Sequence, residues 1–312
     1  MNYLRSLIAR SWRTAITLFK IMLPAMILVR FLDQFGFSQS IGEFIGPIMA
    51  LVGLPAEAGI VWAVAMFSSL FGGIGALITL APQMELNVGQ VSILAAMMLF
   101  AHALVIEQAV VHKAGANFFT TSAIRIVAGF LYAIVAYHAI DYLGVLQEPA
   151  EFTWAPEGLE SDDWVEWSIA TLQSMVIMFI IIVALLVLLD IIAKLGIDRL
   201  LSKLLAPVHY LIGIRRELAP ITTVGLLMGI AYGGGLIIEQ LREKAISKRE
   251  LFLTLSFLSI FHAVIEDTLL MMAFGADIWV ILVFRGIFSV IFMAILARMI
   301  FFKEEPAIEP AE

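Results

Sequence analysis

The stretch HAVIEDTLLMMAFGAD, residues 262–277, places a histidine, a glutamate and an aspartate within six positions of a strongly apolar run. A second stretch, HALVIEQAVVHKAGAN at residues 102–117, lies 160 residues earlier and again carries a histidine and an acid. Ionisable groups in such sequence are costly in a bilayer, so they normally face a bundle interior or a wet cavity. The two stretches therefore indicate an internal repeat and a buried polar site.

The composition predicts a membrane protein. Of 312 residues, 62% are hydrophobic and 14% are charged, more apolar than a soluble domain of this size. Windows such as Val91–Val111, Ser168–Leu189 and Leu251–Phe274 are long enough to cross a bilayer as helices. They lack the alternation of a membrane β-barrel. We expect an all-α polytopic membrane protein.

Several classes of site are disfavoured by the residues that the chain lacks. It has no cysteine, which excludes disulfides and thiolate chemistry, and it contains no Walker loop. The five histidines show no recognisable zinc-ligand spacing, and no nucleophile constellation is visible. The sequence predicts no metal site, no cofactor, no nucleic-acid partner and no enzymatic activity.

An ungapped self-alignment at an offset of 160 pairs scarce residues with one another. Pro47 meets Pro207, His102 meets His262, and Arg125 meets Arg285. Matches at proline, histidine and arginine carry weight because these residues are rare in so apolar a chain and have specific roles. We interpret residues 1–145 and 167–303 as two repeats, joined by a linker at 146–166 and followed by a short acidic tail at 304–312.

Charge predicts how the repeats are oriented. The N-terminal segment is basic, whereas residues 141–166 contain eight acids and no lysine or arginine. Because Lys and Arg accumulate on the cytoplasmic side, the linker is predicted outside and both termini inside. Loop 82–90 has no positive charge, whereas its partner 242–250 carries four. We expect inverted repeats in a multi-pass protein of the bacterial inner (plasma) membrane.

Each repeat also contains an apolar segment rich in glycine. Residues 217–240 are flanked on both sides by basic residues, which favours a re-entrant hairpin, and the interior glycines Gly225, Gly229 and Gly233–Gly235 suit its tip. The partner segment 57–81 would turn at Gly72, Gly73 and Gly75. Ordinary spanning helices that contain glycine are the alternative.

The complete prediction is three spanning helices and one hairpin in each repeat. A short interfacial helix precedes each hairpin. The predicted spans are 14–34, 91–112 and 117–141, then 167–192, 251–273 and 278–298; the interfacial helices are 40–54 and 199–213.

Polar residues within these segments are the candidates for binding a solute or an ion. They are His102, Glu107, Arg125, Gly73, Gly75, Gly233, Gly235, Glu239, His262, Glu266, Asp267 and Arg285. Counting outward from the turns at Gly115 and Gly275 predicts Arg125–Glu107 and Arg285–Glu266/Asp267 pairs. We expect Asp267–Arg285 to be structural and Glu266 with His262 to handle an ion or proton. A purely structural role for all these charges is the alternative.

The segments also resemble a known family. Gly-Leu-Pro-x-Glu at 53–57, LIGIRRELAP at 211–220 and the loop ISKRE before a long helix resemble the nucleoside-recognition, or Gate, domain. That family includes concentrative nucleoside transporters, the membrane domain of ferrous-iron transporter B and spore-maturation proteins. The resemblance implies inverted repeats with re-entrant hairpins. The Gln-Thr-Glu tip motif of the nucleoside transporters is absent here, and GGIGALIT and YGGGLIIEQ stand in its place.

Architecture and resemblance together predict a secondary transporter of a small polar solute, nucleoside-like or other, coupled to H⁺ or Na⁺. The alternative is a non-transporting membrane scaffold or a subunit of a membrane complex. The expected partners are the lipid bilayer, the solute and its coupling ion, with a homo-oligomer also compatible with the sequence.

Inverted topology is open to a direct test. Single cysteines introduced at Gln83 and Ser247 are expected to react with membrane-impermeant reagents from opposite sides of the membrane. The chain has no native cysteine, so background labelling is absent. Labelling of both positions from one side would contradict the inverted arrangement.

Overall fold

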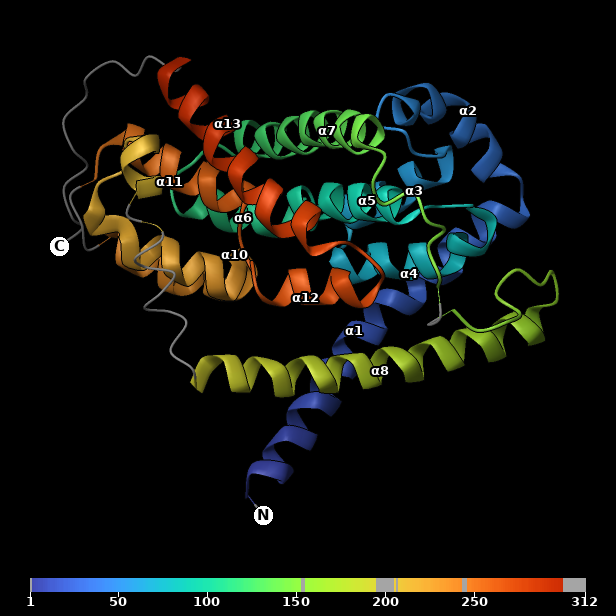
Figure 1. Cartoon of the computed structure of the whole chain (residues 1–312). Helices are drawn as coiled ribbons and strands as arrows, with labels where there is room; N and C mark the ends of the chain where they lie inside the picture. The colour runs from blue at the N-terminus through green and yellow to red at the C-terminus, as the bar shows by residue number, and fades with distance from the viewer. Residues whose placement is uncertain (1, 153–154, 195–204, 206, 243–245, 300–312) are drawn as a thin grey trace.

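The computed structural model describes residues 2–152, 155–194, 205, 207–242 and 246–299 (Figure 1). Within these residues the chain is helical and contains no strand, which confirms the all-α prediction. Of the predicted helix at 199–213, residues 205 and 207–213 are described, and 205 and 207–212 are helical; the tail at 304–312 lies outside the described residues.

The helices follow one another through both halves with short connections. In the first half they are α1 (Asn2–Gln34), α2 (Phe37–Ala50), α3 (Ala56–Phe67), α4 (Leu70–Leu80), η1 (Ala81–Gln83), α5 (Val88–Phe100), α6 (Leu104–Lys113) and α7 (Phe118–Leu143). In the second half they are α8 (Trp164–Lys194), η2 (Arg216–Leu218), α10 (Ala219–Arg242), α11 (Lys248–Ile260), α12 (Glu266–Ala273), the π-helical η3 (Trp279–Phe284) and α13 (Arg285–Met299).

Five helical segments among the described residues are long and apolar enough to cross a membrane. They are Leu7–Gln34, Val88–Lys113, Phe118–Leu143, Trp164–Ile192 and Trp279–Met299. The protein is therefore a multi-pass membrane protein. The sixth predicted span, 251–273, is interrupted, because α11 ends at Ile260 and α12 begins only at Glu266.

Both glycine-rich segments form helical hairpins. A side chain added at Gly73 would lie 2.6 Å from the Cβ of Ala65, and one at Gly233 would lie 3.2 Å from the Cγ1 of Val224. Residues eight or nine positions apart can approach so closely only if the chain folds back, because a straight helix would separate them by more than 10 Å. Neither 57–81 nor 217–240 is therefore a single straight helix, and the spanning-helix alternative is wrong.

The first hairpin turns earlier than predicted, whereas the second turns at Gly229, one of the glycines that the sequence indicated. The first hairpin turns at Ser68–Ser69, where the Ser69 hydroxyl caps α4 by accepting from the N–H of Gly72. The second turns at Gly229, with φ 72° and ψ 175°, a conformation essentially restricted to glycine. Gly72–Gly75 and Gly233–Gly235 instead lie in the helical arms that follow, where small residues allow close packing.

The two hairpins lie toward opposite ends of the bundle. In Figure 1, α3 and α4 are on the right, whereas α10 and α11 are on the left. This placement agrees with the expected plan, although their entry from opposite sides of a bilayer stays a prediction.

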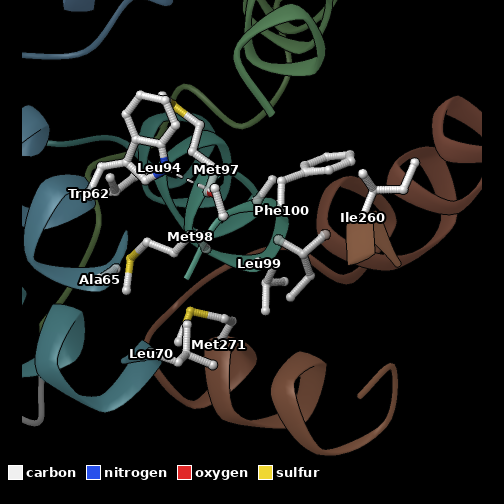
Figure 2. Close-up of a cluster of buried hydrophobic side chains, with 14 of the residues drawn as sticks. Trp62, Ala65, Leu70, Leu94, Met97, Met98, Leu99, Phe100, Ile260 and Met271 are labelled. Atoms are coloured by element: carbon white, nitrogen blue, oxygen red, sulfur yellow. Dashed lines mark hydrogen bonds between the residues drawn. The ribbon is translucent and has the colours of Figure 1, made fainter. Parts of the chain in front are cut away.

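The buried helix α5 forms the centre of the core. Its residues Met97 to Phe100 contact α3, α4, α11 and α12 (Figure 2), and all are nearly inaccessible. The indole N–H of Trp62 donates to the carbonyl of Met97 over 3.0 Å, which fixes α3 against α5 and satisfies a buried donor. The first hairpin is thereby held rigidly at the point where α5 ends.

The acidic linker folds against the start of α5. The carbonyl of Leu146 accepts from Gly89 and that of Leu86 accepts from Ala150, over 2.9 and 2.8 Å. Arg30 donates to the carbonyl of Ser161, and its guanidinium lies 5.6 Å from the ring of Trp164. The described residues of the linker therefore pack against this end of the protein.

The tip at Gly229 allows a matched test. Gly229→Ala is expected to lower the free energy of unfolding by about 1–3 kcal/mol, because alanine is strained at this φ and ψ. Gly235→Ala is the control, since an added Cβ there meets nothing within 4 Å and the residue is helical. Thermal unfolding in detergent measures both. Equal melting temperatures would contradict a tip at Gly229.

Candidate functional site

His102 and His262, the two histidines that are 160 residues apart, each lie where a helix is broken. The sequence predicts continuous helices over 91–112 and 251–273, and this is wrong. The chain leaves α5 at Phe100 and α11 at Ile260, and Ala103 and Ala263 adopt left-handed backbone angles, with φ of 46° and 44°. Alanine disfavours this conformation, so the surrounding structure must hold it in place.

Each break is held by the hairpin of its own half. The N–H of Ala103 donates to the carbonyl of Ala65 over 2.9 Å. In the second half the N–H of Ala263 donates to the carbonyl of Gly225 over 3.3 Å. Unwound backbone away from water needs partners of this kind. The hairpin and the break thus form one unit in each half.

Both histidines point the same ring atom into the space between the breaks. The Nδ1 of His102 lies 2.9 Å from the carbonyl of Met98, and the Nδ1 of His262 lies 2.9 Å from that of Leu258. A carbonyl can only accept, so each Nδ1 carries the hydrogen and each neutral ring turns the Nε2 lone pair inward. The rings lie side by side, with centroids 5.2 Å apart.

Glu107 joins the two halves at this point. Its carboxylate accepts from Nη1 of Arg125 over 2.6 Å, which confirms the predicted Arg125–Glu107 pair. The same carboxylate lies 3.5 Å from Nε2 of His102 and 3.3 Å from Nε2 of His262. Sequence spacing did not predict the contact with His262, because that residue comes from the other half. The cluster is almost completely buried.

The predicted pairs of the second half are wrong. Asp267 forms no ion pair with Arg285 among the described residues, and its Oδ2 lies 3.8 Å from Nε2 of His102. Nor does Glu266 pair with His262, whose Nε2 faces Glu107 instead. The break at 261–265 rotates the start of α12, so the helical angles assumed for a continuous helix do not apply.

Arg285 differs from its counterpart Arg125. Arg125 donates to Glu107 and, through Nε, to the carbonyl of Phe100 over 2.7 Å. Arg285 is equally inaccessible, but none of its three side-chain nitrogens has a hydrogen-bond partner in the described part of the chain. Its guanidinium lies 4.9 Å from the centroid of Phe261. Burying a cation without a hydrogen-bond acceptor is energetically costly.

Comparison with known proteins finds similarity of sequence to one domain family and one relative. The profile of the Gate domain, described as nucleoside recognition, matches residues 15–118. The chain is also 30% identical over 283 residues to the uncharacterized membrane protein YvoD of Bacillus subtilis strain 168, across 89% of this chain and 88% of the relative. The chain belongs to the Gate family. No solved structure matches it. A Gate-like character of the second half stays a prediction, because the profile match ends at 118.

The remaining candidates of this Gate protein lie away from the cluster. The absent side chains of Gly73 and Gly75 let α4 approach α3 and α1, since an added Cβ would meet Ala65 or the backbone of Met22. Gly233 is packed within the second hairpin, whereas Gly235 faces open space. Glu239 is on the exposed face of the second arm of α10. Their roles in binding stay predictions.

The cluster also contains a possible metal site, which the sequence did not predict. One nitrogen or oxygen from each of His102, Glu107 and His262 lies within 4.8 Å of the others, and all three residues are buried. The ligands come from two breaks far apart along the chain, so no local spacing could reveal them. The 160-residue repeat of the histidines was the one available signal.

The two arginines of the Gate protein make a matched pair of variants. Arg125→Met leaves Glu107 buried without its cation and is expected to cost about 3–5 kcal/mol of unfolding free energy. Arg285→Met removes a guanidinium that lacks acceptors and is expected to change stability by less than about 1 kcal/mol. Thermal unfolding followed by tryptophan fluorescence compares them. An equal loss in both variants would show that Arg285 has a counter-ion in the folded protein.

Proposed function

We propose that this Gate protein is a secondary transporter of a small polar solute in the bacterial inner (plasma) membrane, with both termini in the cytoplasm. Movement of the solute is coupled to a cation, H⁺ or Na⁺. The observation that carries the proposal is the meeting of two broken helices, each bonded to the hairpin of its own half, at one buried polar cluster.

Two features support the transporter proposal: the broken helices and the charges buried between them. Transporters place solute and ion sites where discontinuous helices expose backbone and side-chain groups away from lipid. Here each break replaces regular helix bonds with bonds to a hairpin, as between Ala263 and Gly225. Charges kept inside a membrane protein against their cost usually mark an ion or solute path. The carboxylates of Glu107 and Asp267 are suitable ligands for a coupling cation.

Arg285 supplies the chemistry for the solute. Its unpaired guanidinium can donate to carbonyl, carboxylate or phosphate oxygens in a planar, bidentate manner. The adjacent ring of Phe261 offers an apolar face beside this charge. A small solute with acceptor oxygens and a flat ring, such as a nucleoside or nucleobase, matches both features, and the Gate profile is described as nucleoside recognition.

A non-transporting scaffold is the second candidate, favoured by the Arg125–Glu107 pair. This pair is short, buried and fully engaged between α6 and α7, as expected of a structural lock. The scaffold would use the cluster to fix the halves and would bind no solute.

The test combines binding with transport. Purified protein is first screened for thermal stabilisation by nucleosides, nucleobases and amino acids. Solutes that stabilise it are then offered to proteoliposomes with an imposed H⁺ or Na⁺ gradient. Gradient-dependent uptake is expected, and Arg285→Met is expected to abolish uptake while the protein remains folded. His138→Gln, on the exposed face of α7, is the control and should transport normally. Stabilisation and uptake by none of these solutes would favour the scaffold.

A further inference from the structure

The three side chains at the centre of the cluster present more acceptors than donors to one another. The Nδ1 atoms of His102 and His262 are both engaged with carbonyls, so each neutral ring offers a lone pair at Nε2. Both Nε2 atoms face the Glu107 carboxylate at 3.5 and 3.3 Å. Nε2 of His262 has no hydrogen-bond partner among the described residues, although the side chain is buried. Hydrogen-bond acceptors on the two imidazoles therefore face acceptor oxygens of the Glu107 carboxylate in a buried space.

A single proton does not resolve this arrangement. A proton on one imidazole would satisfy one of the two contacts with Glu107 and leave the other histidine with its lone pair against a carboxylate oxygen. Protonating both rings would place two cations 5.2 Å apart, with Arg125 also bound to the same carboxylate. Repulsion among three such charges in a low dielectric is severe. One cation that coordinates all three groups removes every unfavourable contact at once.

We infer that His102, His262 and Glu107 form a binding site for a divalent late transition-metal ion of the Zn²⁺ type. Two imidazoles and one carboxylate are a ligand set that Zn²⁺ takes when one position is left open. The set is drawn from both halves, and the inference does not require that the protein transports anything.

The distances suit four-coordinate geometry. Ligand atoms about 2.1 Å from a tetrahedral zinc ion are separated from one another by about 3.4 Å, whereas adjacent ligands of an octahedral ion at that radius are about 3.0 Å apart. Nε2 of His102 lies 3.5 Å from Oε1 of Glu107, and Nε2 of His262 lies 3.3 Å from Oε2, so each imidazole is about one tetrahedral edge from the carboxylate oxygen nearest to it. One ligand atom from each of the three residues lies within 4.8 Å of the others. Hard cations such as Mg²⁺ would select oxygen ligands and smaller separations.

The surroundings resemble those of established metal ligands. Metal-bound histidines commonly donate their other ring N–H to a carbonyl, as both histidines do here with Met98 and Leu258. The ligating carboxylate is itself held by a donor, Nη1 of Arg125. These contacts orient the three ligands before any ion arrives, which reduces the cost of ordering them.

The local charge also favours a divalent ion. With neutral imidazoles, the facing groups are the carboxylates of Glu107 and Asp267 and the guanidinium of Arg125. The net charge of these three groups is −1, and a bound divalent cation would change it to +1. Asp267, with Oδ2 at 3.8 Å from Nε2 of His102, adds negative charge beside the three ligands. Arg125 opposes the ion and lowers its affinity relative to a site without a neighbouring cation.

The experiment measures metal binding by the full-length chain, without any transport assay. The protein is purified in detergent with an affinity tag that contains no histidine, stripped with a chelator, and titrated with Zn²⁺ by calorimetry. Co²⁺ serves as a spectroscopic probe of coordination. We expect one saturable equivalent, visible bands of tetrahedral Co²⁺, and a melting temperature that rises with Zn²⁺.

The variants separate this site from adventitious binding. His102→Gln and His262→Gln each keep the Arg125–Glu107 pair and are expected to weaken Zn²⁺ binding at least about tenfold and to remove the Co²⁺ bands. The double variant His112→Gln/His138→Gln removes two exposed histidines and is expected to bind as the unaltered chain does. The absence of cysteine excludes thiolate binding in all of them.

Each contrary outcome is distinct. The inference is overturned if the unaltered chain shows no saturable equivalent, if both folded single variants bind Zn²⁺ undiminished, or if the exposed-histidine control loses binding. Size-exclusion chromatography establishes that each variant is folded. If only one of the two single variants folds, that variant alone is enough for the test. Metal binding without solute uptake would contradict only the transporter proposal, whereas uptake without metal binding would contradict only the metal site.

Discussion

One carboxylate, that of Glu107, carries the central constraint of this structure. It is buried, it neutralises Arg125, and it faces a histidine from each half. A charge so far from water must be surrounded by partners, and these partners must come from several helices at once. The position of α7 follows from Arg125, and the positions of the two helix breaks follow from the histidines. The fold can therefore be understood as the packing required to bring four polar groups to one point.

The halves use the same plan with different contents. Ala103 and Ala263 share the left-handed backbone, and each is bonded to a hairpin carbonyl in its own half. The side chains around them have diverged. The first half supplies a complete ion pair, whereas the second supplies an arginine without an acceptor and two acids that do not pair with it. The two halves have thus kept the same backbone plan while their buried arginines have come to differ in their partners.

The class of fold and several residues of the site could be predicted from the sequence, whereas most of the contacts between those residues could not. Apolar windows indicated spanning helices, and the repeated histidines indicated where polar groups would gather. The Arg125–Glu107 pair followed from counting along two helices joined by a tight turn, and that counting holds because α6 and α7 are regular. It failed for Arg285, because neither the break before α12 nor the π-helical turn at Trp279–Phe284 has a local sequence signal. Alanine, at both breaks, is a good helix former whose left-handed angles arise from tertiary bonds alone.

The hydrogen bonds between each helix break and its hairpin lie within one half, so the boundary between the halves runs through the polar cluster. Hydrogen bonds such as Ala103 to Ala65 lie within one half, whereas the approach of His262 to Glu107 crosses from one half to the other. Displacement of the halves would leave these backbone bonds intact but would separate the two imidazoles, together with other bonds between the halves such as that from the N–H of Asp277 to the hydroxyl of Ser92. The polar cluster is thus one of the places where the halves are joined, and an ion held there by ligands from both halves would strengthen that connection.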